Sequence, residues 1–169
     1  MTASRAAVLA SLLPAWPSDA DAAHDPQASI VLTELKSAFP NGENSYRQWF
    51  LRVVGILGDP VAGRAAIKSA NLAGLKLDGN GYGYPRAFTV NPGEEDLKLV
   101  HRLAALRSGK PGIPVVLDPF SGGGSIPFEA ARYGFETISN ELNPVATAIL
   151  QGTVSLPAQL GPSFTKVIA

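Results

Sequence analysis

The fold prediction for this sequence depends mainly on residues 115–146, VVLDPFSGGGSIPFEAARYGFETISNELNPVA. An apolar run ends at Asp118, three glycines follow at 122–124, and a second short run leads to Glu141. The residues between the two runs favour a helix. A strand, a glycine turn, a helix and a second strand in this order predict two parallel strands joined by a right-handed crossover.

Elements on either side extend this alternation. The residues from Glu94 to Arg107 place acids in the first turn of a helix and bases in the last, as the helix dipole favours. Ser125 is expected to cap the helix that follows the glycines. The expected elements of this half are helices over 94–107, 125–133 and 144–153, strands over 114–117 and 135–140, and an extended segment over 85–92.

The first half of the chain has the apolar spacing that is typical of helices. Trp49, Val53 and Leu57 fall on one face of such a helix, where a core position is far more common than a base-stacking one. Asp59 followed by Pro60 predicts a capped helix start. The expected helices cover 3–13, 27–39, 45–57 and 60–72, with a polar connector over 14–26 and an irregular glycine-rich segment over 74–83.

The composition is that of a globular protein and argues against several kinds of site. Hydrophobic residues make up 46% and charged residues 17% of the chain, which is too apolar for disorder. The 14 Lys and Arg balance the 14 Asp and Glu, so net charge gives no direct argument for nucleic acid. Without cysteine there is no disulfide or thiolate metal site, which agrees with a reducing, cytoplasmic compartment. The two histidines are isolated and predict no metal site, and no apolar run predicts a membrane partner.

The glycine turn falls where ligands gather in open α/β sheets, at the carboxyl end of a parallel strand. Gly122 and Gly124 can adopt a positive φ and let a ligand approach the backbone. Amides at the start of the next helix can face a carboxylate or a phosphate. Asp118 at the strand tip suits an ammonium group, and Glu141 after the second strand suits the two hydroxyls of a ribose.

Three other interpretations of the glycines fit less well. A linker is disfavoured because an apolar strand and a helix flank the glycines closely. A Walker loop requires Gly-Lys-Ser/Thr, whereas Ser125 and Ile126 follow here. A dinucleotide site requires G-x-G-x-x-G, and GGGSIPF has no third glycine in place.

The residues DPFSGGGSIPFEA resemble the first cofactor-binding motif of S-adenosylmethionine-dependent amino-methyltransferases that act on DNA. The longer run through NELNPVA is similar to a narrower family, the large adenine-specific DNA methylases with an N-terminal DUF1156 domain. TASRAAVLASLLP also resembles a segment of these proteins, so the resemblance covers residues 2–13 and 84–157. It implies an α/β fold with a helical N-terminal region over 1–83, followed over 84–169 by the incomplete start of a Rossmann-like class I methyltransferase domain.

The resemblance implies a role for each matching residue in binding S-adenosyl-L-methionine. Asp118 would lie near the methionine amino group, and Glu141 would hold the ribose hydroxyls. Leu142 and Asn143 would flank the adenine. Phe88 would close the methionine end of the pocket, although a core position suits this residue equally well. The remaining residues would line the methionine and the sugar: Phe120, Ser121, Gly122 and Gly124.

The resemblance also defines what the sequence lacks. Family members hold the target amine with an Asn/Asp-Pro-Pro-Tyr/Phe motif, whose aromatic residue stacks on the flipped base. No such tetrapeptide occurs here. We therefore expect the cofactor-binding fragment of a restriction-modification type enzyme that methylates the N6 amine of adenine in DNA. The fragment would have no catalytic residue, would be inactive alone, and would meet DNA through the remainder of the protein.

Two alternatives to this interpretation stay open. One is a non-catalytic binding module that keeps the start of the methyltransferase fold. The other is a methyltransferase acting on RNA or protein. In each case a partner chain is a candidate to complete the sheet, because two strands with open edges are marginal by themselves.

Overall fold

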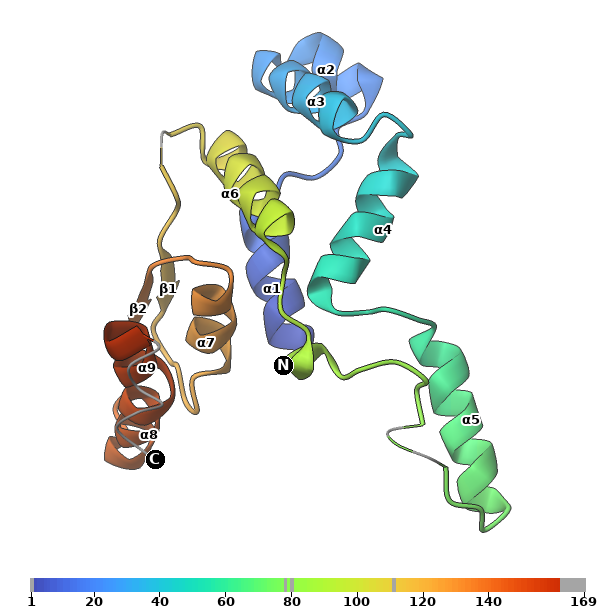
Figure 1. Ribbon diagram of the computed structural model, residues 1–169. Helices are drawn as coiled ribbons and strands as arrows, with labels where there is room; N and C mark the ends of the chain where they lie inside the picture. Colours follow the sequence, from blue (N-terminus) through green and yellow to red (C-terminus); the bar gives the residue numbers. More distant parts are fainter. Residues whose placement is uncertain (1, 78, 80, 111, 162–169) are drawn as a thin grey trace. The chain divides into compact units, whose positions relative to one another are not determined.

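The computed structural model describes residues 2–77, 79, 81–110 and 112–161 (Figure 1). The chain divides into two compact units. The sheet unit comprises Ala3–Pro14 and the described residues from Pro92 onward. The helical unit comprises Thr2 and Ala15–Asn91.

Helices and two short strands alternate in the C-terminal part of the sheet unit, as the sequence predicts. The first helix of the chain belongs to this unit as well. In chain order the elements are α1 (Thr2–Leu12), α6 (Glu94–Ser108), β1 (Val116–Asp118), α7 (Ser125–Arg132), β2 (Thr137–Ser139), α8 (Pro144–Leu150), the π-helical turn η2 (Gln151–Ser155) and α9 (Leu156–Leu160).

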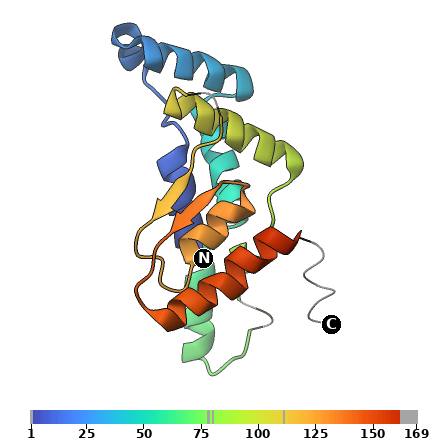
Figure 2. The same cartoon turned by 90° about the vertical axis from the view of Figure 1, so that its left-hand side faces the viewer.

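The two strands form a parallel sheet, so the predicted α/β arrangement with a crossover helix is present. Val116 pairs with Thr137 and Asp118 with Ser139, and Figure 2 shows the two arrows side by side and pointing the same way. The backbone pairing extends one residue past β2, where Asn140 N donates to Asp118 O at 2.9 Å. Helix α7 packs against both strands, as the crossover requires.

Helix α1 joins the sheet unit through long-range contacts, whereas the expected domain boundary after residue 83 grouped it with the other early helices. Arg5 of α1 forms an ion pair with Glu129 of α7, and Arg107 of α6 donates to the carbonyl of Ser11 at 3.3 Å. The unit's core is fully buried and includes Leu9, Val100, Leu103, Ala130 and Tyr133. Contacts across more than 90 residues of sequence therefore decide where α1 belongs.

The helical unit contains the expected helices, with one addition. Asp59 caps α5 by accepting from the amides of Val61 and Ala62, which confirms the predicted start of that helix. The connector over 14–26 contains a short helix, because Ser18 and Asp21 form a capping box that starts it. The elements are α2 (Asp19–His24), α3 (Pro26–Ala38), α4 (Glu43–Val54), α5 (Pro60–Leu72) and the 3-10 turn η1 (Ala87–Thr89), which replaces the middle of the extended segment expected over 85–92.

An aromatic cluster forms the core of the helical unit. The ring of Trp49 stacks on Tyr46 at a centroid distance of 5.8 Å and lies 5.4 Å from Phe39. Trp49 is buried, which confirms the core position expected for it. Leu57 is expected on the same helix face, but α4 ends at Val54 with Gly55 as a left-handed C-cap, so Leu57 lies beyond the helix and is exposed.

Trp49→Ala should lower the free energy of unfolding of the helical unit by about 3–5 kcal/mol, because it removes a buried aromatic side chain and leaves a cavity. Leu72→Ala is the control, since Leu72 is exposed on α5, and its effect should stay within about 0.5 kcal/mol. Urea unfolding followed by fluorescence of the remaining tryptophan measures both. Equal effects of the two substitutions would contradict the assignment of Trp49 to the core.

Candidate functional site

The glycine turn follows β1 and is hydrogen-bonded to the carboxyl ends of both strands. The Ser121 hydroxyl donates to the carbonyl of Asp118 at 2.9 Å, and the Ser121 amide donates to the carbonyl of Asn140 at 3.1 Å. The Gly124 amide then donates back to the carbonyl of Ser121 at 2.8 Å. Ser121 is buried and holds the turn against the carboxyl edge of the sheet.

Two of the three glycines adopt conformations that favour glycine. Gly122 has a φ of 50° and Gly124 a φ of 81°, both in the left-handed region. A Cβ on Gly124 would lie 2.6 Å from Cδ2 of Leu150, because the start of α7 packs tightly against α8. Among the described residues, no atom lies within 4 Å of the Cβ position of Gly122, so they leave this side of the turn open.

The N-cap of α7 is Gly124, and the expectation that Ser125 caps this helix is wrong. Ser125 is already the first helical residue, and no side chain of the described residues caps the helix start. The left-handed conformation of Gly124 starts the helix one residue earlier than the sequence suggested. The Ser125 side chain instead accepts a hydrogen bond from the Ser4 hydroxyl of α1 at 3.1 Å.

Glu141 lies against the glycine turn, although it follows the other strand. One carboxylate oxygen, Oε2, accepts from the Gly122 amide at 2.6 Å, and Oε1 accepts from the Asn143 amide at 2.9 Å. These backbone hydrogen bonds, from Asn143 first and Gly122 second, hold the pKa of Glu141 below its ordinary value. The structure therefore brings an ionised carboxylate to the open side of the turn.

Asp118 occupies the tip of β1, at the base of the same turn. Its side chain is largely buried, and Oδ1 lies 3.3 Å from the amide of Phe120, from which it accepts a hydrogen bond. Its backbone carbonyl accepts from Ser121 and Asn140, as described above. Asp118 thus ends one of the two paired strands and Glu141 follows the other, and both carboxylates accept hydrogen bonds from backbone amides of the same segment, 120–122.

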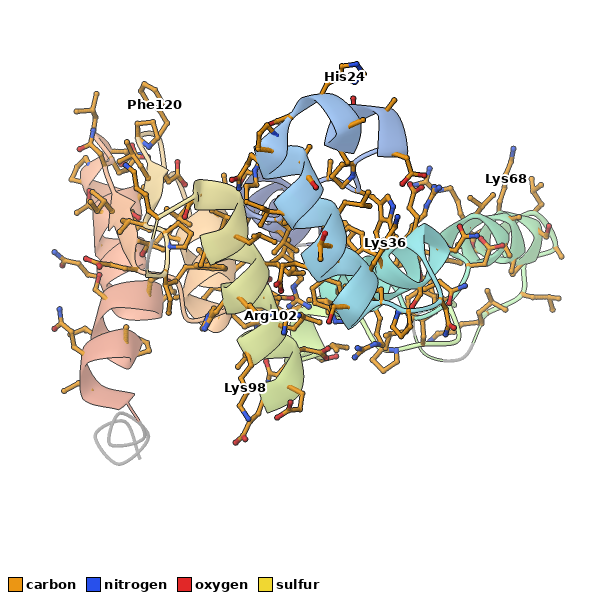
Figure 3. All side chains as sticks on the ribbon, turned by 90° about the horizontal axis from the view of Figure 1, so that it is seen from above. His24, Lys36, Lys68, Lys98, Arg102 and Phe120 are labelled. Atoms are coloured by element: carbon orange, nitrogen blue, oxygen red, sulfur yellow. The ribbon has the colours of Figure 1, made fainter. Side chains whose placement is uncertain are left out.

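Two apolar side chains stand at this edge of the sheet without cover from the described residues. Phe120 follows β1 and is 83% exposed, and Leu142 follows β2 and is 87% exposed. Figure 3 shows Phe120 pointing away from the ribbon. Exposed large apolar side chains next to polar groups are typical of binding sites.

The two other expected site residues have structural roles or lie elsewhere. Asn143 is the N-cap of α8, where its Oδ1 accepts from the Val145 amide at 3.0 Å. Phe88 lies in η1 of the helical unit and is about half exposed. Its expected place beside the cofactor stays a prediction.

Sequence reasoning did not single out Arg5 and Glu129, which form a buried ion pair behind the glycine turn. A signal was present, because Arg5 is the only charged residue within the apolar segment 3–13. Within the described ranges, no cluster of three or more His, Asp and Glu side chains could hold a metal ion. Nor does any helix there have the length and apolar character needed to cross a membrane.

Comparisons of the chain with models of protein families, with curated proteins and with solved structures found no match. The residues and their geometry are therefore the basis for the functional proposal.

Gly124→Ala should lower the free energy of unfolding by about 2–4 kcal/mol, since a Cβ there combines left-handed strain with overpacking against Leu150. Gly123→Ala is the matched control in the same turn. Its φ is not in the left-handed region and its Cβ position is open, so the change should stay within about 0.5 kcal/mol. Urea unfolding of both variants measures this, and a Gly123→Ala effect as large as that of Gly124→Ala would count against the geometry.

The acid side of the stability profile should depend on Glu141. Because the folded-state pKa lies below the ordinary value of 4.5, the stabilisation is fully present above the unfolded pKa and is lost as the pH falls through the folded one. Glu141→Gln should therefore be less stable than the wild type at neutral pH and lose less stability on acidification. Thermal unfolding from about pH 7 to pH 3 tests this, with the exposed Glu136→Gln as control. Parallel curves for the wild type and Glu141→Gln would refute the prediction.

Proposed function

We propose that the glycine turn and Glu141 bind the adenosyl group of S-adenosyl-L-methionine, and that the chain is the cofactor-binding part of a methyltransferase. The observation that carries the proposal is the contact of the Glu141 carboxylate with the amide of Gly122. This contact brings an ionised acceptor to an open glycine turn at the carboxyl edge of a parallel sheet, where nucleoside cofactors bind in α/β folds.

The hydrogen-bonding capacity of Glu141 supports a ribose ligand. An ionised carboxylate has about four lone-pair sites. One backbone amide accounts for a hydrogen bond to each oxygen of Glu141. The remaining lone pairs can accept from the two adjacent hydroxyls of a ribose. A glutamate with a pKa at or below its ordinary value is ionised at neutral pH, as an acceptor for two hydroxyls must be.

The other groups of the turn match the rest of the cofactor. The carboxylate of Asp118 suits the methionine ammonium. The start of α7 has no side-chain cap, so its first amides suit the methionine carboxylate. Phe120 and Leu142 offer apolar surface for the adenine and for the methylene groups of the methionine, and full burial of such a side chain contributes about 1.5–3 kcal/mol.

The resemblance in motif supports a finer proposal, namely methyl transfer to the N6 amine of adenine in DNA. Such a transfer also requires groups that hold the target amine in line with the methyl group. The sequence has no Asn/Asp-Pro-Pro-Tyr/Phe tetrapeptide for this purpose. The residues proposed here therefore bind and orient the cofactor, and the groups that hold DNA and the amine are assigned to residues outside this chain.

Calorimetry with S-adenosylhomocysteine tests cofactor binding directly. The wild-type chain should bind, and Glu141→Ala should weaken binding by about 1–3 kcal/mol because the ribose hydroxyls lose their acceptor. Glu136→Ala is the control, since Glu136 is exposed and just precedes β2. Wild-type affinity in folded Glu141→Ala, or absence of binding to the wild type, would exclude the proposal. Tighter binding of NAD than of S-adenosylhomocysteine would point to a dinucleotide instead.

A further inference from the structure

A buried ion pair connects α1 to α7, on the faces of the two helices that are shielded from solvent. The Arg5 Nε donates to Glu129 Oε2 at 2.8 Å, and both side chains are 0% exposed. These two residues are 124 positions apart in the sequence. Ser4 and Ser125 make a second contact between the same helices at 3.1 Å. Ser125 and Glu129 are one helical turn apart and thus share a face of α7.

Stability by itself does not account for this pair. Taking two charges out of water costs several kcal/mol each, and well-packed apolar residues in place of a buried ion pair are often as stable or more so. Glu129 Oε1 is buried and accepts no hydrogen bond from the described residues, so the site is not even fully satisfied. Buried ionic groups of this kind are best explained where they fix one specific arrangement of the elements that carry them.

Arg5 lies close to the oppositely charged Glu129 and to an aromatic ring. The Arg5 guanidinium lies 5.7 Å from the centre of the Tyr133 ring. The face of this ring offers the arginine a cation–π contact, and burial raises the pKa of the Tyr133 phenol to about 12. Arg132 approaches Glu129 Oε2 less closely, at 3.9 Å.

Helix α7 begins at the glycine turn and carries Glu129 one helical turn further on, so it links the ion pair to the turn. Ser125 is the first residue of the helix, and Gly124 before it is packed against Leu150. Gly122, two residues earlier, donates to Glu141. A rotation or slide of α7 would move the Gly122 amide relative to Glu141, because the turn between them is short and closed by the hydrogen bond from Gly124 N to Ser121 O.

We propose that Arg5 and Glu129 are positioning residues for the cofactor site, and that α1 is a required part of that site although it contributes no group to the ligand. The pair fixes the rotation and height of α7 and thereby the approach of Gly122 to Glu141. This inference rests on the function proposed above. The planar guanidinium is suited to the task, because its donors have a fixed direction that a lysine ammonium lacks.

The test uses the full chain with Arg5→Met and Glu129→Leu combined, which removes both charges and leaves no unpaired ion. Two quantities are measured: the affinity for S-adenosylhomocysteine by calorimetry, and the pKa of Glu141 by carboxyl NMR titration. The folded double variant should bind about tenfold more weakly, in the range by which residues without ligand contact modulate binding. The pKa of Glu141 should rise toward its ordinary value, because the Gly122 amide moves away. A role in stability alone would change neither quantity in the folded protein.

Arg107→Met is the matched control, since Arg107 also contacts α1 but at Ser11, through an exposed hydrogen bond. It should leave both quantities unchanged. Should the double variant not fold, Arg5→Lys decides in its place, because it keeps the charge and loses the fixed fork, and it should shift both quantities in the same direction. Wild-type affinity and an unchanged Glu141 pKa in the folded variant would overturn the inference. If the wild type binds no S-adenosylhomocysteine, the proposed function fails, and the Glu141 pKa still decides whether the pair positions the turn.

Discussion

The hydrogen bond from the Gly122 amide to the Glu141 carboxylate is the constraint on which the proposed site depends. It requires β1 and β2 to be parallel and in their observed register, because only then do Asp118 and Glu141 reach the same edge of the sheet. It also requires a left-handed residue at position 122, so that the amide faces the second strand end. A charged acceptor on a backbone amide forms one of the stronger hydrogen bonds in proteins.

The turn that carries this hydrogen bond is supported from two directions. Leu150 of α8 packs so close to Gly124 that a Cβ there would lie 2.6 Å from Leu150 Cδ2 and would require Leu150 to shift. The buried ion pair of Arg5 and Glu129 joins the helix that begins at the turn to α1. On the side of the Gly122 Cβ position, the turn is not covered by the described residues. A rigid support behind an open backbone is the arrangement expected where a cofactor is held at the main chain, since preorganisation reduces the entropy lost on binding.

The sheet that carries the site has an apolar face without cover from the described residues. Leu117 and Ile138 are partners in the register and both are exposed. Parallel sheets are almost always covered on both faces by helices. Strands added at the open edges, as expected from the sequence, would complete the sheet but would leave this face to be covered by helices.

The order of strand, glycine turn, helix and strand could be predicted from the sequence, because caps and side-chain spacing act within a few residues, whereas the short helix α2 and the turn η1 were not expected. The start of α5 at Asp59 and the core position of Trp49 followed from such patterns. Long-range packing determines that α1 belongs with the sheet, that Gly124 rather than Ser125 is the N-cap of α7, and that Glu141 contacts Gly122. These features depend on contacts between residues that are far apart in the chain, and no local periodicity records which side chains meet once the chain has folded.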